Sequence, residues 1–156
     1  MLASYKWLKE LSGCDYSPEE TEKILTMLGI EVESIIDYRK KYEQFIVAEV
    51  FKAEKHPGAD KLTICEVGDG SDTRTVICGA PNVAAGQKVL LGLPGAVVPQ
   101  AGFMIERRTI RKVESEGMIC SQFELELGDD KSGIWVLPED APTGKPLAEY
   151  LHLDDI

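Results

Sequence analysis

The sequence of 156 residues predicts a mainly β fold with flanking helices (α+β), in which a small five-stranded barrel follows an N-terminal helical segment. Two observations favour this fold. Runs of strand length, separated by Gly, Pro, Asn and Asp, recur between residues 45 and 110. The first 37 residues instead carry helix capping and stop signals. Several short strands with frequent turns are typical of a closed barrel rather than a βαβ sheet.

The N-terminal segment is expected to hold two helices. The first covers residues 4–11. The second starts at residues 17–20 (SPEE), which supply a capping Ser, a Pro at the first helical position and a Glu at the third. Gly29 stops this helix. Residues 30–38 alternate roughly as a strand, and residues 39–41 are interpreted as a linker.

The barrel strands are expected at residues 45–53, 62–67, 75–78, 88–93 and 103–110. Phe45, Phe51 and Phe103 are expected in the barrel core. A further strand at residues 134–136 and a last helix at residues 147–151 complete the predicted elements.

Charge is distributed unevenly along the chain. The net charge of −10 argues against a general nucleic-acid binder, because phosphate contacts need Lys and Arg. Residues 1–37 carry 3 basic and 8 acidic side chains, and residues 122–156 carry 2 and 9. Residues 38–121 carry 12 basic and 10 acidic side chains. Any nucleic-acid contact is therefore expected in the middle of the chain.

Several classes of protein are disfavoured. The apolar stretches are too short to span a bilayer, and the N-terminus has no secretory pattern, so no membrane partner is expected. The cysteines at 14, 65, 78 and 120 form no zinc spacing and are interpreted as reduced thiols of a cytoplasmic protein. No nucleophile–base set, phosphate-binding loop or metal set is recognisable, so no catalytic residue is expected.

Four motifs occur in order in the middle of the chain: residues 56–62 (HPGADKL), 77–83 (ICGAPNV), 95–99 (GAVVP) and 110–118 (IRKVESEGM). Together they resemble the signatures of the tRNA-binding OB family, which implies an OB-type barrel. The chain departs from the family at Lys112, where Gly is usual. A backbone that needs a positive φ there would be mildly strained.

Residues outside the barrel indicate one branch of that family. Residues 118–121 (MICS), together with both ends of the chain, are similar to the opening of bacterial phenylalanyl-tRNA synthetase β subunits. The resemblance implies an N-terminal piece of a longer subunit. Residues 1–38 would be half of a discontinuous domain, residues 39–150 the tRNA-binding OB domain, and residues 151–156 the start of the first domain's continuation.

The same resemblance implies partners and cofactors for the parent enzyme, a phenylalanine–tRNA ligase. They are tRNA-Phe, the synthetase α subunit and the rest of the β subunit in an α2β2 assembly, with ATP and Mg²⁺ used by the parent enzyme. The aminoacylation and editing sites would lie outside this chain, which itself would hold no cofactor and catalyse nothing.

The candidate tRNA-binding residues are Lys61, Asn82, Arg107, Arg108, Arg111, Lys112, Ser115, Gly117 and Met118. Lys61 follows a turn and can contact phosphate as a point charge, or simply be solvated. Asn82 can offer a donor and an acceptor to RNA, or cap its own loop. Ser115, Gly117 and Met118 are implied only by the resemblance.

The four cations at 107, 108, 111 and 112 form the densest basic cluster. Strand alternation would send Arg107 and Arg111 to one side, and Arg108 and Lys112 to the other. The cluster can contact phosphate, or pair with the neighbouring glutamates. His56 is expected to fix its turn by hydrogen bonding.

Two functions stay open at this point. One is a non-catalytic tRNA-binding module that adds affinity to a synthetase. The other is a docking module within the synthetase assembly, which the acidic total charge favours. Because no aromatic pair lies in a basic strand, recognition of tRNA shape and backbone is expected rather than of base sequence.

Overall fold

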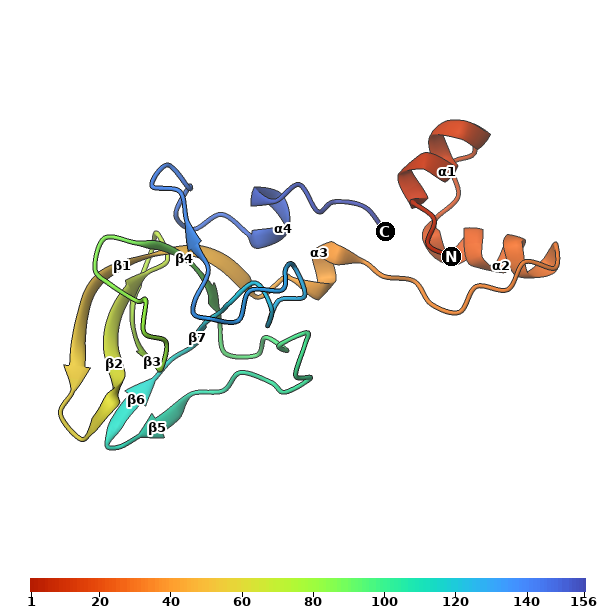
Figure 1. Cartoon of the computed structure of the whole chain (residues 1–156). Coiled ribbons are helices and arrows are strands. Elements are labelled where there is room, and N and C mark those ends of the chain that lie inside the picture. Colours follow the sequence, from red (N-terminus) through yellow and green to blue (C-terminus); the bar gives the residue numbers. More distant parts are fainter.

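The computed structural model of the protein describes all residues from Met1 to Ile156 and is built mainly from β-strands (Figure 1). The strands are β1 (Phe45–His56), β2 (Ala59–Gly68), β3 (Thr73–Cys78), β4 (Lys88–Gly92), β5 (Arg108–Ile110), β6 (Val113–Ser115), β7 (Met118–Ile119) and β8 (Val136–Leu137). The helices are α1 (Tyr5–Ser12), α2 (Pro18–Met27), α3 (Tyr38–Lys41) and α4 (Leu147–Tyr150).

The main sheet is antiparallel, with the strand order β3-β2-β1-β4-β7, and β8 also pairs with β4. Strands β5 and β6 pair only with each other. The prediction of a mainly β fold with a few short helices is thus confirmed. The pairing itself leaves β3 and β7 as the two ends of the ladder.

The central strand β1 contributes to two apolar clusters. Phe45 and Val47 belong to one, with α4 and the loop residue Leu125. Ala48 and Val50 belong to the other, with buried residues of β2, β3 and β4. The phenol of the buried Tyr42 donates a hydrogen bond to the Leu125 carbonyl at 2.6 Å, which closes the first cluster.

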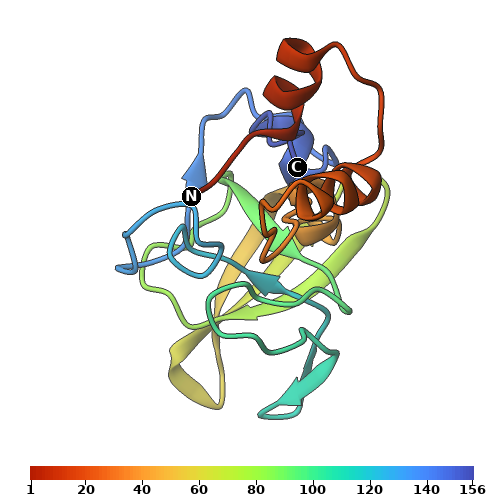
Figure 2. The same cartoon turned by 90° about the vertical axis from the view of Figure 1, so that its right-hand side faces the viewer.

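The helices α1 and α2 lie to one side of the sheet, and Figure 2 views the molecule from this end. Neither helix contains a buried residue. Their caps match the sequence prediction: Ser4 accepts from the Trp7 amide, and Ser17 and Glu20 form a reciprocal capping box. Local backbone chemistry, rather than burial, therefore specifies these two helices.

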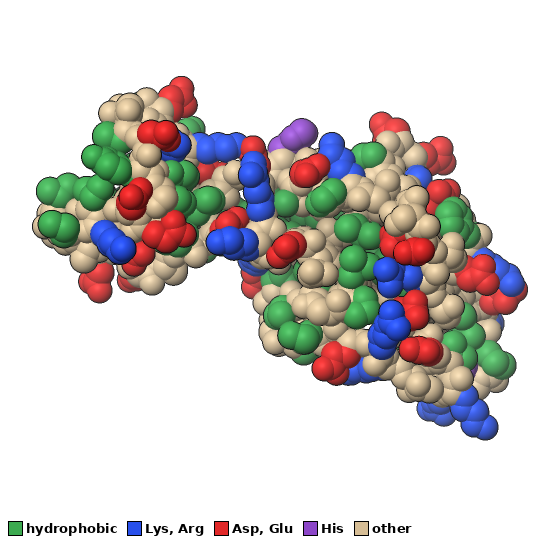
Figure 3. Space-filling model, turned by 180° about the vertical axis from the view of Figure 1, so that it is seen from behind, with side chains coloured by type: hydrophobic (Ala, Val, Ile, Leu, Met, Phe, Trp, Pro, Cys, Tyr) green, Lys and Arg blue, Asp and Glu red, His purple; other side chains and the backbone are tan.

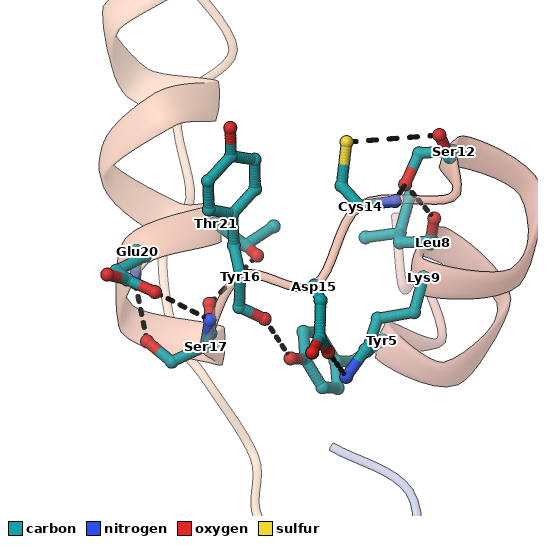
Figure 4. Close-up of polar contacts among 10 residues, drawn as sticks. All are labelled: Tyr5, Leu8, Lys9, Ser12, Cys14, Asp15, Tyr16, Ser17, Glu20 and Thr21. Atoms are coloured by element: carbon teal, nitrogen blue, oxygen red, sulfur yellow. Dashed lines mark hydrogen bonds and ion pairs between the residues drawn. The ribbon is translucent and has the colours of Figure 1, made fainter.

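Polar contacts hold α1 and α2 together (Figure 4). The Tyr5 hydroxyl donates to the Tyr16 carbonyl, and Lys9 forms an ion pair with Asp15. The segment meets the rest of the chain at the C-terminus, where the Tyr5 amide donates to the Ile156 carbonyl at 3.0 Å and Lys6 pairs with Asp154.

Two predictions for residues 30–41 are wrong. Residues 30–37 form no strand, because no other segment pairs with their backbone. The expected linker at residues 39–41 lies within α3, because the Asp37 carboxylate caps the amides of Arg39 and Lys40. An Asp at the N-cap satisfies amides that a short helix leaves free.

The predicted strand at residues 103–110 is reduced to β5, because residues 95–105 fold back on themselves. There the Val98 amide donates to the Phe103 carbonyl at 2.9 Å. Phe51 and Phe103 are not in the core but are 54% and 43% exposed. Phe51 lies where the register of β1 shifts between Val50 and Lys52, which rotates its ring out of the core and over Gly68.

None of the helices combines the length and apolar character that crossing a bilayer requires. The four cysteines are free thiols, and three are buried. Burial raises the pKa of Cys65 to about 12, so this thiol stays protonated at neutral pH.

Candidate nucleic-acid interface

The β1–β2 hairpin is built around His56. Its side chain is only 3% exposed, and its Nδ1 accepts a hydrogen bond from the Gly58 amide at 2.9 Å. His56 pairs with Ala59 across the turn. The expectation that His56 fixes this turn is confirmed. Lys55 and Lys61 flank the turn and are exposed.

The β5–β6 hairpin turns on Arg111 and Lys112. Ile110 pairs with Val113, so the loop has two residues, and both have positive φ values, 49° and 69°. This conformation is normally taken by Asn or Gly, and it costs about 1 kcal/mol or more for each other residue. The strain expected at Lys112 is therefore confirmed, and Arg111 shares it.

The expected alternation of the cations is wrong for the same reason. Arg111 and Lys112 form a turn and do not continue the strand of Arg108. All of the cations at 107, 108, 111 and 112 are exposed.

The tips of the two hairpins touch. The His56 Nε2 lies 3.2 Å from the Ile110 carbonyl oxygen, and Gly58 packs close to Arg111, since a Cβ on Gly58 would lie 3.8 Å from the Arg111 Cβ. Figure 1 shows both hairpins at the same end of the molecule, far from α1 and α2. Segments that are 54 residues apart in sequence thus form one surface, which we call the hairpin-tip surface.

This surface carries cations without partners. Arg107 pairs with Glu116 at 3.8 Å, and Lys52 pairs with Glu54. The exposed cations of the two hairpins that form no ion pair are Lys55, Lys61, Arg108, Arg111 and Lys112. Figure 3 shows Lys and Arg side chains at the end of the molecule farthest from α1 and α2, with acidic side chains spread over much of the rest.

The other predicted residues lie elsewhere. Asn82 forms a double hydrogen bond with Ile134: its Nδ2 donates to the carbonyl at 3.0 Å and its Oδ1 accepts from the amide at 2.9 Å. Both halves of the Asn82 amide are thus engaged in joining its loop to the segment before β8.

Ser115, Gly117 and Met118 lie at the base of the β5–β6 hairpin. Ser115 is buried, and its hydroxyl accepts from the Ile77 amide at 3.0 Å and donates to the Gly117 carbonyl. A Cβ on Gly117 would lie 2.8 Å from the Gly92 oxygen, so only Gly fits there. Met118 is partly buried against the first apolar cluster.

The structure therefore brings Lys61, Arg107, Arg108, Arg111 and Lys112 to one end and uses the rest of the candidate set inside the fold. Lys55, beside His56 in the first motif, also lies on this surface, although it was not among the candidates from the sequence. No group of three or more His, Cys, Asp or Glu side chains is placed to hold a metal ion. The arrangement offers exposed positive charge, which suits a polyanion.

Residues 45–146 match the family model described as "Putative tRNA binding domain". The chain belongs to this family. The match covers the sheet, the hairpin-tip surface and the segment up to α4, and it excludes α1 and α2.

Relatives extend the similarity over nearly the whole chain. The phenylalanine–tRNA ligase β subunit of Geobacter sulfurreducens is 46% identical over 155 residues, which is 99% of this chain and 19% of that protein. The β subunit of Novosphingobium aromaticivorans is 46% identical over 158 residues, with 100% and 20% covered. The chain thus spans about a fifth of the length of these aminoacyl-tRNA synthetase subunits.

One solved structure supports the fold. The crystal structure of a MetRS related protein from Pyrococcus horikoshii aligns with a TM-score of 0.54 and 22% identity, over 73% of this chain and 98% of that one. At this identity the likeness concerns the fold alone.

Proposed function

We propose that this chain is the tRNA-binding module of a phenylalanine–tRNA ligase β subunit, and that the hairpin-tip surface contacts the phosphate backbone of tRNA. The observation that carries the proposal is the cluster of unpaired cations at one end of a domain whose family is described as tRNA-binding. When unpaired Lys and Arg side chains neutralise phosphates, the counterions condensed on the nucleic acid are released. This release favours binding even by a protein of net negative charge.

The sheet is proposed to be a five-stranded OB-type barrel. The order β3-β2-β1-β4-β7 becomes cyclic if the segment after β6 joins β3. Two hydrogen bonds support this: the Glu116 amide donates to the Thr75 carbonyl at 2.8 Å, and the Ile77 amide donates to the Ser115 hydroxyl. OB barrels bind oligonucleotides through loops and one sheet face, which agrees with binding at hairpin tips.

The chain is proposed to divide at residues 38 and 150. Residues 39–150 would be the OB domain, and residues 1–38 with residues 151–156 would belong to a second, discontinuous domain. The contacts between Tyr5 and Ile156 and between Lys6 and Asp154 support the pairing of the two ends. The exposed apolar side chains of α1 and α2 suit docking against further parts of the synthetase, so docking is assigned to this segment.

The parent enzyme is proposed to be an α2β2 phenylalanine–tRNA ligase of the cytoplasm that uses ATP and Mg²⁺ and acts on tRNA-Phe. The similarity to β subunits supports this assignment. The chain would contribute affinity for tRNA and no catalytic group, and its own binding can be weak because the other contacts of the enzyme raise the effective concentration.

The proposal is tested by titrating the 156-residue chain with tRNA-Phe at about 50 mM and about 200 mM salt, the range over which phosphate contacts weaken strongly. Arg111→Ala and Lys61→Ala are expected to bind more weakly and to show a shallower salt dependence. Lys23→Ala, which removes an exposed lysine of α2, is the matched control. Absence of binding by the unaltered chain at the lower salt concentration would overturn the proposal.

A further inference from the structure

The two cationic hairpins are joined by one buried side chain, and we infer that His56 is a positioning residue for tRNA binding. It contacts no phosphate itself. It holds the Arg111–Lys112 turn against the turn of the β1–β2 hairpin, so that cations from both hairpins face one polyanion together. This inference rests on the proposed function and adds a residue that acts through the binding cations.

The hydrogen bonds of His56 define its role. Nδ1 accepts from the Gly58 amide at 2.9 Å, so the ring proton lies on Nε2. Nε2 then donates to the Ile110 carbonyl at 3.2 Å, immediately before the strained turn. Because His56 is 3% exposed, water does not replace either bond easily. The His56 ring therefore stabilises the β1–β2 turn through Nδ1 and binds the β5–β6 hairpin through Nε2.

The β5–β6 hairpin needs such a support. Each of its strands has three residues, and the pair joins no larger sheet. An isolated two-stranded hairpin is marginally stable in water, and the left-handed Arg111 and Lys112 weaken it further. Its base is fastened to β3 through Ser115 and Glu116, which leaves His56 as the hydrogen-bonding fastening of its tip.

Fixing the tip matters for binding a polyanion. Two cation groups held at a constant separation engage neighbouring phosphates as one unit, whereas a mobile tip must be ordered on binding. Loss of the hydrogen bond from His56 to Ile110 is therefore expected to reduce the number of phosphates bound at once, even though every cation is still present.

Two substitutions separate the two bonds of His56. His56→Asn places an amide oxygen near the position of Nδ1, so it keeps the acceptor for Gly58 and cannot reach Ile110. His56→Gln places an amide nitrogen near Nε2, so it keeps the donor to Ile110 and loses the turn acceptor. A purely local role in the β1–β2 turn predicts that Gln is the damaging change, and the positioning role predicts that Asn is.

The test is titration of both variants with tRNA-Phe across a salt series. For His56→Asn we expect an affinity loss of about fivefold to tenfold, the size of one lost hydrogen bond, and a slope of log K against log salt that is shallower by about one. For His56→Gln we expect an affinity within about twofold of the unaltered chain. The reverse order, with Asn silent and Gln impaired, would overturn the inference.

Amide hydrogen exchange of Val113, which pairs with Ile110 across the turn, is measured without tRNA and gives a readout that does not depend on the proposed function. His56→Asn is expected to speed exchange in β6 while the exchange of β1 and β4 stays unchanged. If the unaltered chain fails to bind tRNA but His56→Asn speeds exchange in β6, the proposed function is wrong, while the positioning of the β5–β6 hairpin by His56 is supported. If exchange in β6 is unchanged, the positioning role is wrong.

Discussion

Residues 42–150, which hold the sheet, and residues 1–41, the N-terminal segment, are stabilised in opposite ways. Every buried residue lies between Tyr42 and Ala148, whereas residues 1–41 contain none. Yet both α1 and α2 have well-formed side-chain caps at their N-termini. Capping specifies where a helix begins and ends, but most helical stability in proteins comes from packing of an apolar face. The comparison shows that a clear local signal does not by itself produce a core.

The N-terminal segment does carry the apolar side chains for a core. Trp7 is 69% exposed and Leu11 84% exposed, and Met27 and Leu28 are exposed as well. This surface lies at the opposite end of the molecule from the hairpin-tip surface. The two regions thus offer different chemistry, apolar area at one end and unpaired cations at the other, which agrees with docking by the first and tRNA binding by the second.

The largest predicted difference between the two regions is the loss in the free energy of unfolding when a leucine is replaced by alanine. Leu90 is fully buried in β4, and Leu90→Ala is predicted to lower the free energy of unfolding by about 2–5 kcal/mol. Leu11→Ala, in the exposed face of α1, is predicted to change it by less than about 0.5 kcal/mol. Urea denaturation measures both. Equal losses would show that the N-terminal segment has a core of its own.

A second effect concerns pH. Burial alone would raise the pKa of Asp69, but hydrogen bonds from the amides of Asp72 and Ser71, from the Ser71 hydroxyl and from Arg74 lower this pKa to about 2. Because the pKa is lowered on folding, its stabilisation is complete above about pH 4 and is lost as the pH falls towards 2.

Asp69→Asn is therefore predicted to lower the free energy of unfolding by about 2 kcal/mol at pH 7, with the difference shrinking as the pH falls to about 2. Denaturation curves at several pH values between 2 and 7 check this. In the N-terminal segment, Asp15 is fully exposed although Lys9 lowers its pKa, so Asp15→Asn is the control and should have no measurable effect. A difference for Asp69→Asn that does not vary with pH would contradict the account.

A third effect concerns binding. The double change Arg111→Ala with Lys112→Ala removes two unpaired cations from the hairpin-tip surface and is predicted to weaken tRNA binding by about tenfold at low salt. Lys23→Ala, which removes an exposed lysine of α2 that forms no ion pair, is the control and should change affinity by less than about twofold. Fluorescence anisotropy with labelled tRNA-Phe measures both. A similar loss for Lys23→Ala would show that binding is not localised.

The smallest predicted effect concerns the strained backbone at Lys112 and its influence on stability and tRNA binding. Lys112→Gly relieves a left-handed residue and is predicted to raise the free energy of unfolding by about 1 kcal/mol while it weakens tRNA binding a fewfold. Lys112→Asn, which tolerates the same conformation better than Lys, separates charge from strain. If Lys112→Gly bound tRNA as tightly as the unaltered chain, the positive charge in the turn would have no role.

Local signals in the sequence predicted the helix caps and one of the turns. The caps at Ser4 and Ser17 and the turn after His56 depend on a few neighbouring residues, and these were predicted correctly. The strand at residues 30–38 was wrong, because a strand requires a partner that alternation alone does not provide.

The errors at Phe51 and Phe103 have the same origin. A bulge and a folded-back loop decide which way these side chains point, and both depend on backbone pairing with distant residues. The sequence named the unpaired cations of the hairpin-tip surface except Lys55, but the hydrogen bond from His56 to Ile110 joins segments that only the fold brings together. Without knowledge of this hydrogen bond, Lys61 and Arg111 could not be assigned to one surface.

The central claim, that tRNA meets the hairpin-tip surface, is tested most directly by lysine acetylation footprinting with and without tRNA-Phe at low salt. Protection of Lys55, Lys61 and Lys112, with Lys6 and Lys23 modified at unchanged rates, is the predicted result. Protection of Lys6 and Lys23, with the three hairpin lysines still reactive, would contradict the account and would place tRNA at the N-terminal end.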